Sequence, residues 1–200
     1  MRQELLIGIT ESGVMHTDAD PPIPLDTKFQ MVKESGVYDY FDKTPPLELE
    51  DDYRRCSEKY ELPILAGGWF YVLGRDEDLL MENLRLGARL GSLVHNTQII
   101  MDHQDGSLVS DEQVVEIYLR AYETGEACGC RPTFEVHVNM WSEDFRRIEK
   151  VADLVEKQGI PFRMTLDHSH VIFKIDNPHE QEVFNIRESI ENGDLVLDPF

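Results

Sequence analysis

Hydrophobic positions along the chain alternate between two periods, one typical of strands and the other of helices. Short apolar runs predict strands at Leu5–Thr10, Val37–Phe41, Pro63–Ala66, Leu93–Met101, Thr133–Val138 and Phe162–Leu166. Apolar residues spaced three and four apart predict helices at Lys28–Ser35, Leu49–Tyr60, Asp78–Leu90, Asp111–Thr124, from Ser142 to about Gly159, and at about Glu180–Glu191. The pattern is therefore a repeated strand and helix.

Helix-end signals support this division. Ser110 followed three residues later by Gln113 forms a capping box, which predicts that a helix begins at Asp111. Gly125 is expected to stop that helix, and Ser142 is expected to be the N-cap of the next one.

About six strand and helix repeats predict an α/β protein with a parallel sheet, either an open doubly wound sheet or a barrel. The sequence has neither G-x-G-x-x-G nor G-x-x-x-x-G-K-[ST], so the usual first-turn signal of a nucleotide-binding open sheet is missing. Polar residues gather instead where several strands end, which favours a TIM-type (β/α) barrel, because a barrel brings such ends to one mouth. We expect one domain over residues 1–200.

Composition narrows the range of partners. The formal charge of -20 disfavours binding to a phosphate backbone, so no nucleic-acid partner is expected. The apolar run at Leu5–Ile9 is too short for a signal peptide or a membrane span, which favours a cytoplasmic protein with no membrane partner. Three cysteines are too few for a disulfide scaffold, so reduced thiols are expected.

The stretch FEVHVNM carries chemistry on a predicted strand. Glu135, His137 and Asn139 are spaced two apart and project to one side, while Phe134, Val136 and Val138 project to the other. A carboxylate and an imidazole turned inward without partners cost several kcal/mol. A bound divalent cation is one natural compensation, and a buried pair that only orients the strand is the structural alternative.

The next strand ends in TLDHSHVIF, with Asp167 and His170 in the spacing D-x-x-H. Because adjacent parallel strands lie about 4.8 Å apart, ligands from both strands can converge on one ion. Carboxylates with one or two imidazoles suit Mg, Mn, Co or Zn. Gln98 and Trp69, at the ends of two earlier strands, are candidate substrate contacts, although Trp69 is more often a packing residue.

At FEVHVNMWSED and TLDHSHVIF the chain resembles the xylose isomerase-like TIM-barrel superfamily, which includes sugar isomerases, ketose 3-epimerases, inosose dehydratases and endonuclease IV. The resemblance implies that Glu135 and Asp167 bind a divalent metal and that His170 contacts the substrate or the metal. His137 matches an E-x-H variant and is a candidate substrate contact.

The resemblance extends to about residue 175, and the 200 residues show neither the seventh-strand His nor the eighth-strand ligand of relatives. An eight-unit barrel typically needs about 250 residues, so we expect the last two βα units to be missing. A truncated chain, completion by a partner and a degenerate open barrel remain as explanations. An open barrel exposes strand edges, which a homo-oligomer can cover.

These observations favour a metal-dependent sugar or sugar-phosphate isomerase or epimerase that moves a proton through an enediolate. Glu135 is the expected metal ligand and base, Asp167 a second metal ligand, and His170 the hydroxyl contact. The alternative from another class is a noncatalytic ligand-binding or assembly module that keeps the barrel. An endonuclease IV-like phosphoesterase is a third hypothesis, which the net charge disfavours.

Overall fold

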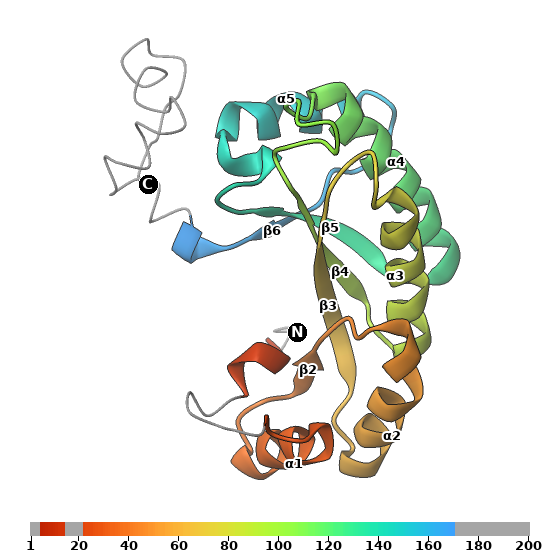
Figure 1. Cartoon of the computed structure of the whole chain (residues 1–200), viewed down its shortest axis with the longest axis vertical. Coiled ribbons are helices and arrows are strands. Elements are labelled where there is room, and N and C mark those ends of the chain that lie inside the picture. Colours follow the sequence, from red (N-terminus) through yellow and green to blue (C-terminus); the bar gives the residue numbers. More distant parts are fainter. Residues whose placement is uncertain (1–4, 15–21, 171–200) are drawn as a thin grey trace. The chain divides into compact units, whose positions relative to one another are not determined.

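The computed structural model describes residues 5–14 and 22–170 (Figure 1). The six strands in this part of the chain are β1 (Gly8–Thr10), β2 (Tyr40–Asp42), β3 (Ile64–Tyr71), β4 (Val94–Ile99), β5 (Arg131–Val136) and β6 (Met164–Leu166). The α-helices are α1 (Leu25–Ser35), α2 (Glu50–Tyr60), α3 (Glu77–Leu90), α4 (Asp111–Cys128) and α5 (Phe145–Glu156). Short 3-10 helices lie at η1 (Glu11–Gly13), η2 (Leu47–Leu49) and η3 (Trp141–Glu143). The helix predicted at Glu180–Glu191 lies outside the described residues.

The strands form one sheet in the order β1-β2-β3-β4-β5-β6. β1 pairs with β2, β2 with β3, and β5 with β6, each time in parallel. In a doubly wound sheet, the order in which the strands are added across the sheet reverses at one point. In a (β/α) barrel, each strand instead lies next to the one before it in the sequence. The strand order therefore confirms the barrel type of winding, with six strands.

The chain divides into two compact units. The first unit contains Met1–Trp69, Glu82–His95 and Thr124–Arg131, and the second contains Phe70–Met81, Asn96–Glu123 and Pro132–Phe200. The single domain over residues 1–200 stays a prediction.

The core of the first unit is aromatic at its centre. Phe29 on α1 stacks on Phe41 of β2 with ring centroids 4.3 Å apart, and Tyr53 of α2 meets Phe29 edge-on. Cys56, Leu62 and Ile64 complete this buried cluster with Val14 and Val32. The helical spacing of apolar residues in α1 and α2 thus places their buried faces against the start of the sheet.

Glu11, just after β1, anchors the polar part of the first unit. Its carboxylate accepts hydrogen bonds from Lys28 at 2.7 Å and Tyr53 at 2.8 Å and lies 2.9 Å from the Lys43 ammonium. Partial burial opposes ionisation, but these partners outweigh it and lower the pKa of Glu11 to about 2. The carboxylate is therefore charged across the physiological range and ties β1 to α1 and α2.

A second aromatic cluster forms the core of the second unit. The rings of Tyr118 on α4 and Phe134 on β5 lie 5.0 Å apart, and Phe162 and Trp141 pack against them. The Tyr118 hydroxyl donates to the carbonyl of Pro161 at 2.7 Å and accepts from the N–H of Arg163 at 2.9 Å. This cluster fixes the segment that leads into β6.

The predicted helix boundaries at the end of α4 and the start of α5 were wrong. Helix α4 runs through Gly125 to Cys128 and ends before Gly129, whose φ of 90° suits glycine. The cost of a glycine inside a helix, about 1 kcal/mol, is small enough for packing to override. Ser142 lies in η3, and the N-cap of α5 is Asp144, whose side chain accepts from the N–H of Arg146.

The capping box was predicted correctly. The N–H of Ser110 donates to the Gln113 side chain at 2.8 Å, and the N–H of Gln113 donates to the Ser110 hydroxyl at 3.2 Å. All three cysteines are free thiols. Within the described residues, no helix combines the length and apolar character that crossing a membrane requires.

Candidate active site

Glu135 is a buried acid of the candidate site, in the second unit. It lies on β5, one residue before that strand ends, and is 6% exposed. The side-chain amides of Asn96 and Gln98, both on β4, donate to the same carboxylate oxygen, Oε2, and the Asn96 bond measures 2.7 Å. The other oxygen, Oε1, accepts no hydrogen bond from the described residues. Glu135 is therefore fixed at one oxygen and available at the other.

His137 follows Glu135 beyond the end of β5, so the prediction that the strand continues to Val138 was wrong. Beyond the end of the strand, Asn139 adopts a left-handed conformation with φ of 61°. The ring atom Nδ1 of His137 lies 2.7 Å from the carbonyl oxygen of Val138. A carbonyl only accepts, so Nδ1 donates to it, and Nε2 is the ring nitrogen left for a ligand hydroxyl.

The turn after β5 is braced by its own side chains. The Ser142 hydroxyl donates to the carbonyl of Glu135 and accepts from the N–H of His137. The buried carboxylate of Glu143 accepts from the N–H of Asn139 at 2.6 Å. These bonds involve residues that the sequence indicated only as the start of a helix. They hold the backbone on both sides of Glu135 and His137.

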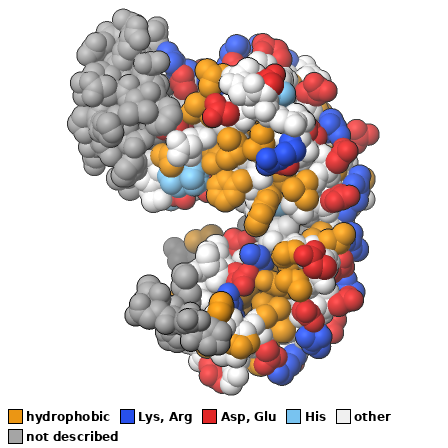
Figure 2. All heavy atoms as spheres, in the orientation of Figure 1, with side chains coloured by type: hydrophobic (Ala, Val, Ile, Leu, Met, Phe, Trp, Pro, Cys, Tyr) orange, Lys and Arg blue, Asp and Glu red, His pale blue; other side chains and the backbone are white. Residues whose placement is uncertain are grey.

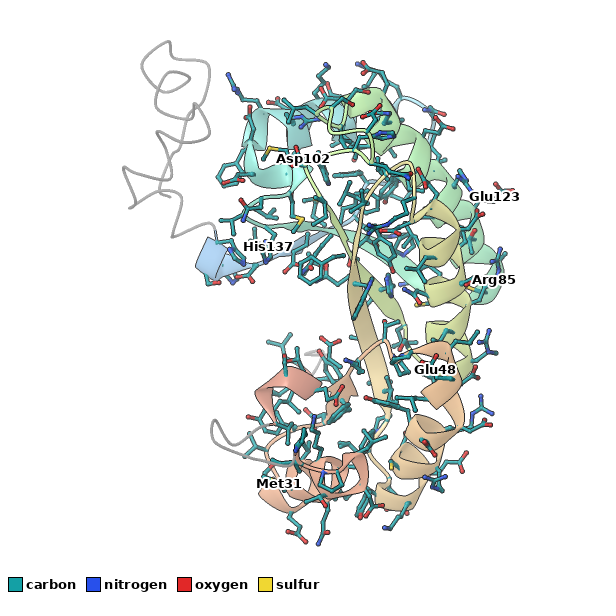
Figure 3. The ribbon with its side chains drawn as sticks, viewed as in Figure 1. Met31, Glu48, Arg85, Asp102, Glu123 and His137 are labelled. Atoms are coloured by element: carbon teal, nitrogen blue, oxygen red, sulfur yellow. The ribbon has the colours of Figure 1, made fainter. Side chains whose placement is uncertain are left out.

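His170 joins His137 from the segment after β6. The two imidazole rings lie 3.7 Å apart between centroids, with planes inclined by 43°. Figure 3 labels His137 near the end of β6, and Figure 2 shows histidine side chains at the surface beside hydrophobic ones. Phe70 of β3 meets the His137 ring edge-on at 6.1 Å and is 48% exposed. The site thus has an imidazole pair with an exposed phenyl ring beside it.

One carboxylate oxygen of Asp167 already accepts hydrogen bonds from the residues that follow it. Its Oδ1 accepts from the N–H and hydroxyl of Ser169, at 2.8 and 2.6 Å, and from the N–H of His170 at 3.4 Å. This is an N-cap of the helical turn that begins at His168. Burial raises the pKa of Asp167, but the bonds from Ser169 and His170 outweigh it and lower the pKa overall. Oδ2 lies 3.6 Å from Nε2 of His170 and is the oxygen left for a ligand.

The remaining predicted site residues fall in different places. Gln98 lies within β4 and contacts Glu135, which the sequence did not indicate. Trp69 is 45% exposed on β3 and belongs to the first unit. Asn96 was missed, although its signal was present as an amide two residues before Gln98 on a strand.

The donor chemistry of the site suits a hard divalent cation, but the described ligands are too few. Glu135 and Asp167 each keep one carboxylate oxygen available, and such oxygens are the ligands that Mg²⁺ and Mn²⁺ prefer. Within residues 5–14 and 22–170, however, no three His, Cys, Asp or Glu side chains group so as to hold a metal ion. The described residues alone do not make the predicted metal site.

No protein-family model matches the sequence, and a search of curated proteins found no match. Solved structures do match. The 3-keto-D-glucoside 4-epimerase from E. coli in its apo form is 12% identical, with a TM-score of 0.64 over 90% of this chain and 75% of that one. A sugar phosphate isomerase/epimerase from Parabacteroides distasonis is 12% identical, with a TM-score of 0.58 over 89% of this chain and 71% of that one.

A family 2 AP endonuclease from Brucella melitensis also matches, at 11% identity and a TM-score of 0.55, over 74% of this chain and 65% of that one. The chain has the fold of these barrel proteins. The predicted resemblance to the xylose isomerase-like barrels is confirmed at the level of the fold. At these identities the likeness shows the barrel fold alone, and function must be argued from the site.

Proposed function

We propose that the protein is an isomerase or epimerase of a sugar or sugar phosphate, with Glu135 as the group that moves the proton. The observation that carries the proposal is the state of Glu135: buried, held by two amides at Oε2 and without a partner at Oε1 among the described residues. A carboxylate held in this way can take a proton from a carbon next to a carbonyl group and return it to the neighbouring carbon. At the same time a proton moves from the hydroxyl on the first carbon to the carbonyl oxygen on the second, so that the carbonyl group changes place with no change in composition.

The histidines supply the substrate contacts in this proposal. Nε2 of His137 accepts a hydroxyl hydrogen, because Nδ1 already donates to Val138. His170, stacked on His137, is the second hydroxyl contact. In this proposal Gln98 acts on the substrate by holding Glu135. Trp69 lies in the first unit and remains a proposed substrate contact.

A divalent ion, Mn, Mg, Co or Zn, is the further part of the proposal, with Glu135 and Asp167 as ligands. Their available oxygens support it, while additional ligands must come from outside the described residues. Metal analysis of the purified protein tests this part by itself. Glu135→Gln and Asp167→Asn should each weaken the binding of Mn²⁺ in a titration, and unchanged affinity in both variants would exclude these two residues as ligands.

The enzyme activity is tested by incubating the protein with D-fructose, D-tagatose, D-psicose and their phosphates and separating the aldose or the 3-epimer that each ketose would give. The wild type should interconvert at least one pair, and Glu135→Gln should lose the conversion while keeping the fold, because the amide cannot accept a proton. A variant that keeps the wild-type rate would reject Glu135 as the base.

A second candidate, a noncatalytic ligand-binding module with the barrel fold, is favoured by one observation: the described residues do not assemble three metal ligands. In that case the sugars should bind without conversion, and a chelator should not change the melting temperature. The likeness to an AP endonuclease does not favour DNA, since a net charge of -20 repels a phosphate backbone.

A further inference from the structure

We infer that Asn96 and Gln98 are positioning residues that occupy one oxygen of Glu135, so that Oε1 alone meets the ligand. The inference rests on the proposed function, in which Glu135 moves the proton. It adds which oxygen acts and which residues select it.

The strand geometry explains how two amides reach one acceptor. Residues two apart on a strand project to the same face, so Asn96 and Gln98 both lie on one side of β4. β4 and β5 are neighbours in the sheet, and both amides donate to Oε2 of Glu135. Two donors on one oxygen occupy the lone pairs with which it would take a proton. Oε1 keeps its lone pairs and is the better acceptor.

The chemistry of the two donors distinguishes Glu135 from structural acids of the same unit. Asp111 lies within 2.7 Å of both Arg147 and Lys150, and Asp144 pairs with Arg146. Those carboxylates are held by cations, which neutralise them. Glu135 is held by neutral amides, which orient the carboxylate and leave its charge uncompensated among the described residues.

Asn96 provides an independent observation. Its amide nitrogen donates to Glu135, while its carbonyl oxygen Oδ1 is buried and has no hydrogen-bond partner in the described part of the chain. A buried amide with a purely structural role normally satisfies both ends, because an unpaired buried acceptor costs free energy. Asn96 keeps only the end that contacts Glu135, as expected of a residue whose role is to donate to that carboxylate.

The arrangement can be tested by NMR without any substrate. In ¹⁵N-labelled full-length protein, the side-chain amide signals of Asn96 and Gln98 are assigned by their loss in Asn96→Leu and Gln98→Met. In Glu135→Gln, one proton of each amide should move upfield, since a bond to a carboxylate becomes a bond to a neutral group or is lost. Unchanged positions of both amides would overturn the inference, whatever the protein catalyses.

Turnover gives the second readout, using the sugar that the wild type converts. Gln98→Met keeps the side-chain length but removes the donors, and Gln98→Glu places a second negative charge against Glu135. We expect kcat to fall by about tenfold in Gln98→Met and further in Gln98→Glu, with KM nearly unchanged, because the histidine contacts remain. Gln104→Met, an exposed glutamine in the same unit, is the matched control and should keep the wild-type kcat.

The two proposals fail in different ways. Full turnover by Glu135→Gln would refute the proposed function, while the NMR shifts would still decide whether the amides hold Oε2. A wild-type kcat in both Gln98 variants, with Glu135→Gln inactive, would overturn the positioning role and leave Glu135 as the base. Circular dichroism of each variant confirms that the loss is not due to unfolding.

Discussion

His95 gives the protein a pH dependence that can be calculated from the structure. The side chain is 1% exposed, in the first unit, and its Nδ1 lies 3.3 Å from the hydroxyl of Thr44. Burial lowers the pKa of His95 from 6.5 to about 3, because the charged ring would lose its hydration. The folded state therefore holds a neutral ring at a pH where the unfolded chain binds a proton.

The direction of the pH effect on stability follows from the difference between the folded and unfolded pKa of His95. The stability contribution is fully present above the unfolded pKa of 6.5 and is lost as the pH falls toward the folded value of about 3. Each pKa unit corresponds to about 1.4 kcal/mol, so moving from about pH 7.5 to about pH 5 should cost about 2 kcal/mol through this one residue. That interval stays above the range in which most carboxylates titrate.

The assay is urea unfolding of the wild type and His95→Gln at both pH values, with each protein compared only with itself. The wild type should lose about 2 kcal/mol, and His95→Gln should lose much less, because glutamine does not titrate. His168→Gln, which removes an exposed histidine, is the control and should behave as the wild type. An equal loss in the wild type and His95→Gln would refute the reasoning.

Three further changes test the fold. Glu11→Gln should lower the free energy of unfolding at neutral pH by about 2 kcal/mol. Because the pKa of Glu11 is lowered to about 2, the variant should also lose less stability than the wild type as the pH falls from about 4.5 toward 2. An equal loss of stability in the two proteins over this pH range would contradict the prediction. Tyr118→Phe should cost about 1–3 kcal/mol, because the hydrogen bond from the N–H of Arg163 to the Tyr118 hydroxyl is lost, and an unchanged urea midpoint would contradict this contribution. Ser110→Ala should lower stability by about 1 kcal/mol through the loss of the cap of α4, and an unchanged urea midpoint would remove the cap as a source of stability.

The alternation of periods was sufficient to predict the order of strands and helices in the described residues, because each helix buries one face and the strands are short apolar runs between the helices. The strand predicted at Pro63–Ala66 was too short, since β3 runs through Gly67 and Gly68 to Tyr71. The barrel type of winding followed from the polar residues at strand ends and is confirmed by the sequential strand order. Boundaries were less certain where packing decides. Gly125 predicted a helix end, yet the helix continues to Gly129, where the backbone turns to positive φ.

The candidate site was predicted in part. The sequence indicated that Glu135, His137, Asp167 and His170 belong together, and the structure brings His137 beside His170 and Asp167 beside His170. It could not show that the amides of Asn96 and Gln98 meet at one oxygen of Glu135, because the register of β4 against β5 is a tertiary property.

The sequence also could not show how many oxygens of Asp167 are available to bind a metal ion. Its Oδ1 is occupied by the cap of the following turn, which a D-x-x-H spacing alone does not reveal. The same spacing that suits a metal ligand also suits an N-cap, because aspartate is favoured in both positions.

The proton-transfer role of Glu135 is tested most directly by deuterium uptake. A ketose that the protein converts is incubated in D₂O with the wild type or with Glu135→Gln, and ¹H NMR follows the signal of the hydrogen next to the carbonyl group. The wild type should exchange this hydrogen for deuterium, and Glu135→Gln should not, because its amide cannot accept the proton. Exchange at the wild-type rate in Glu135→Gln would contradict the account.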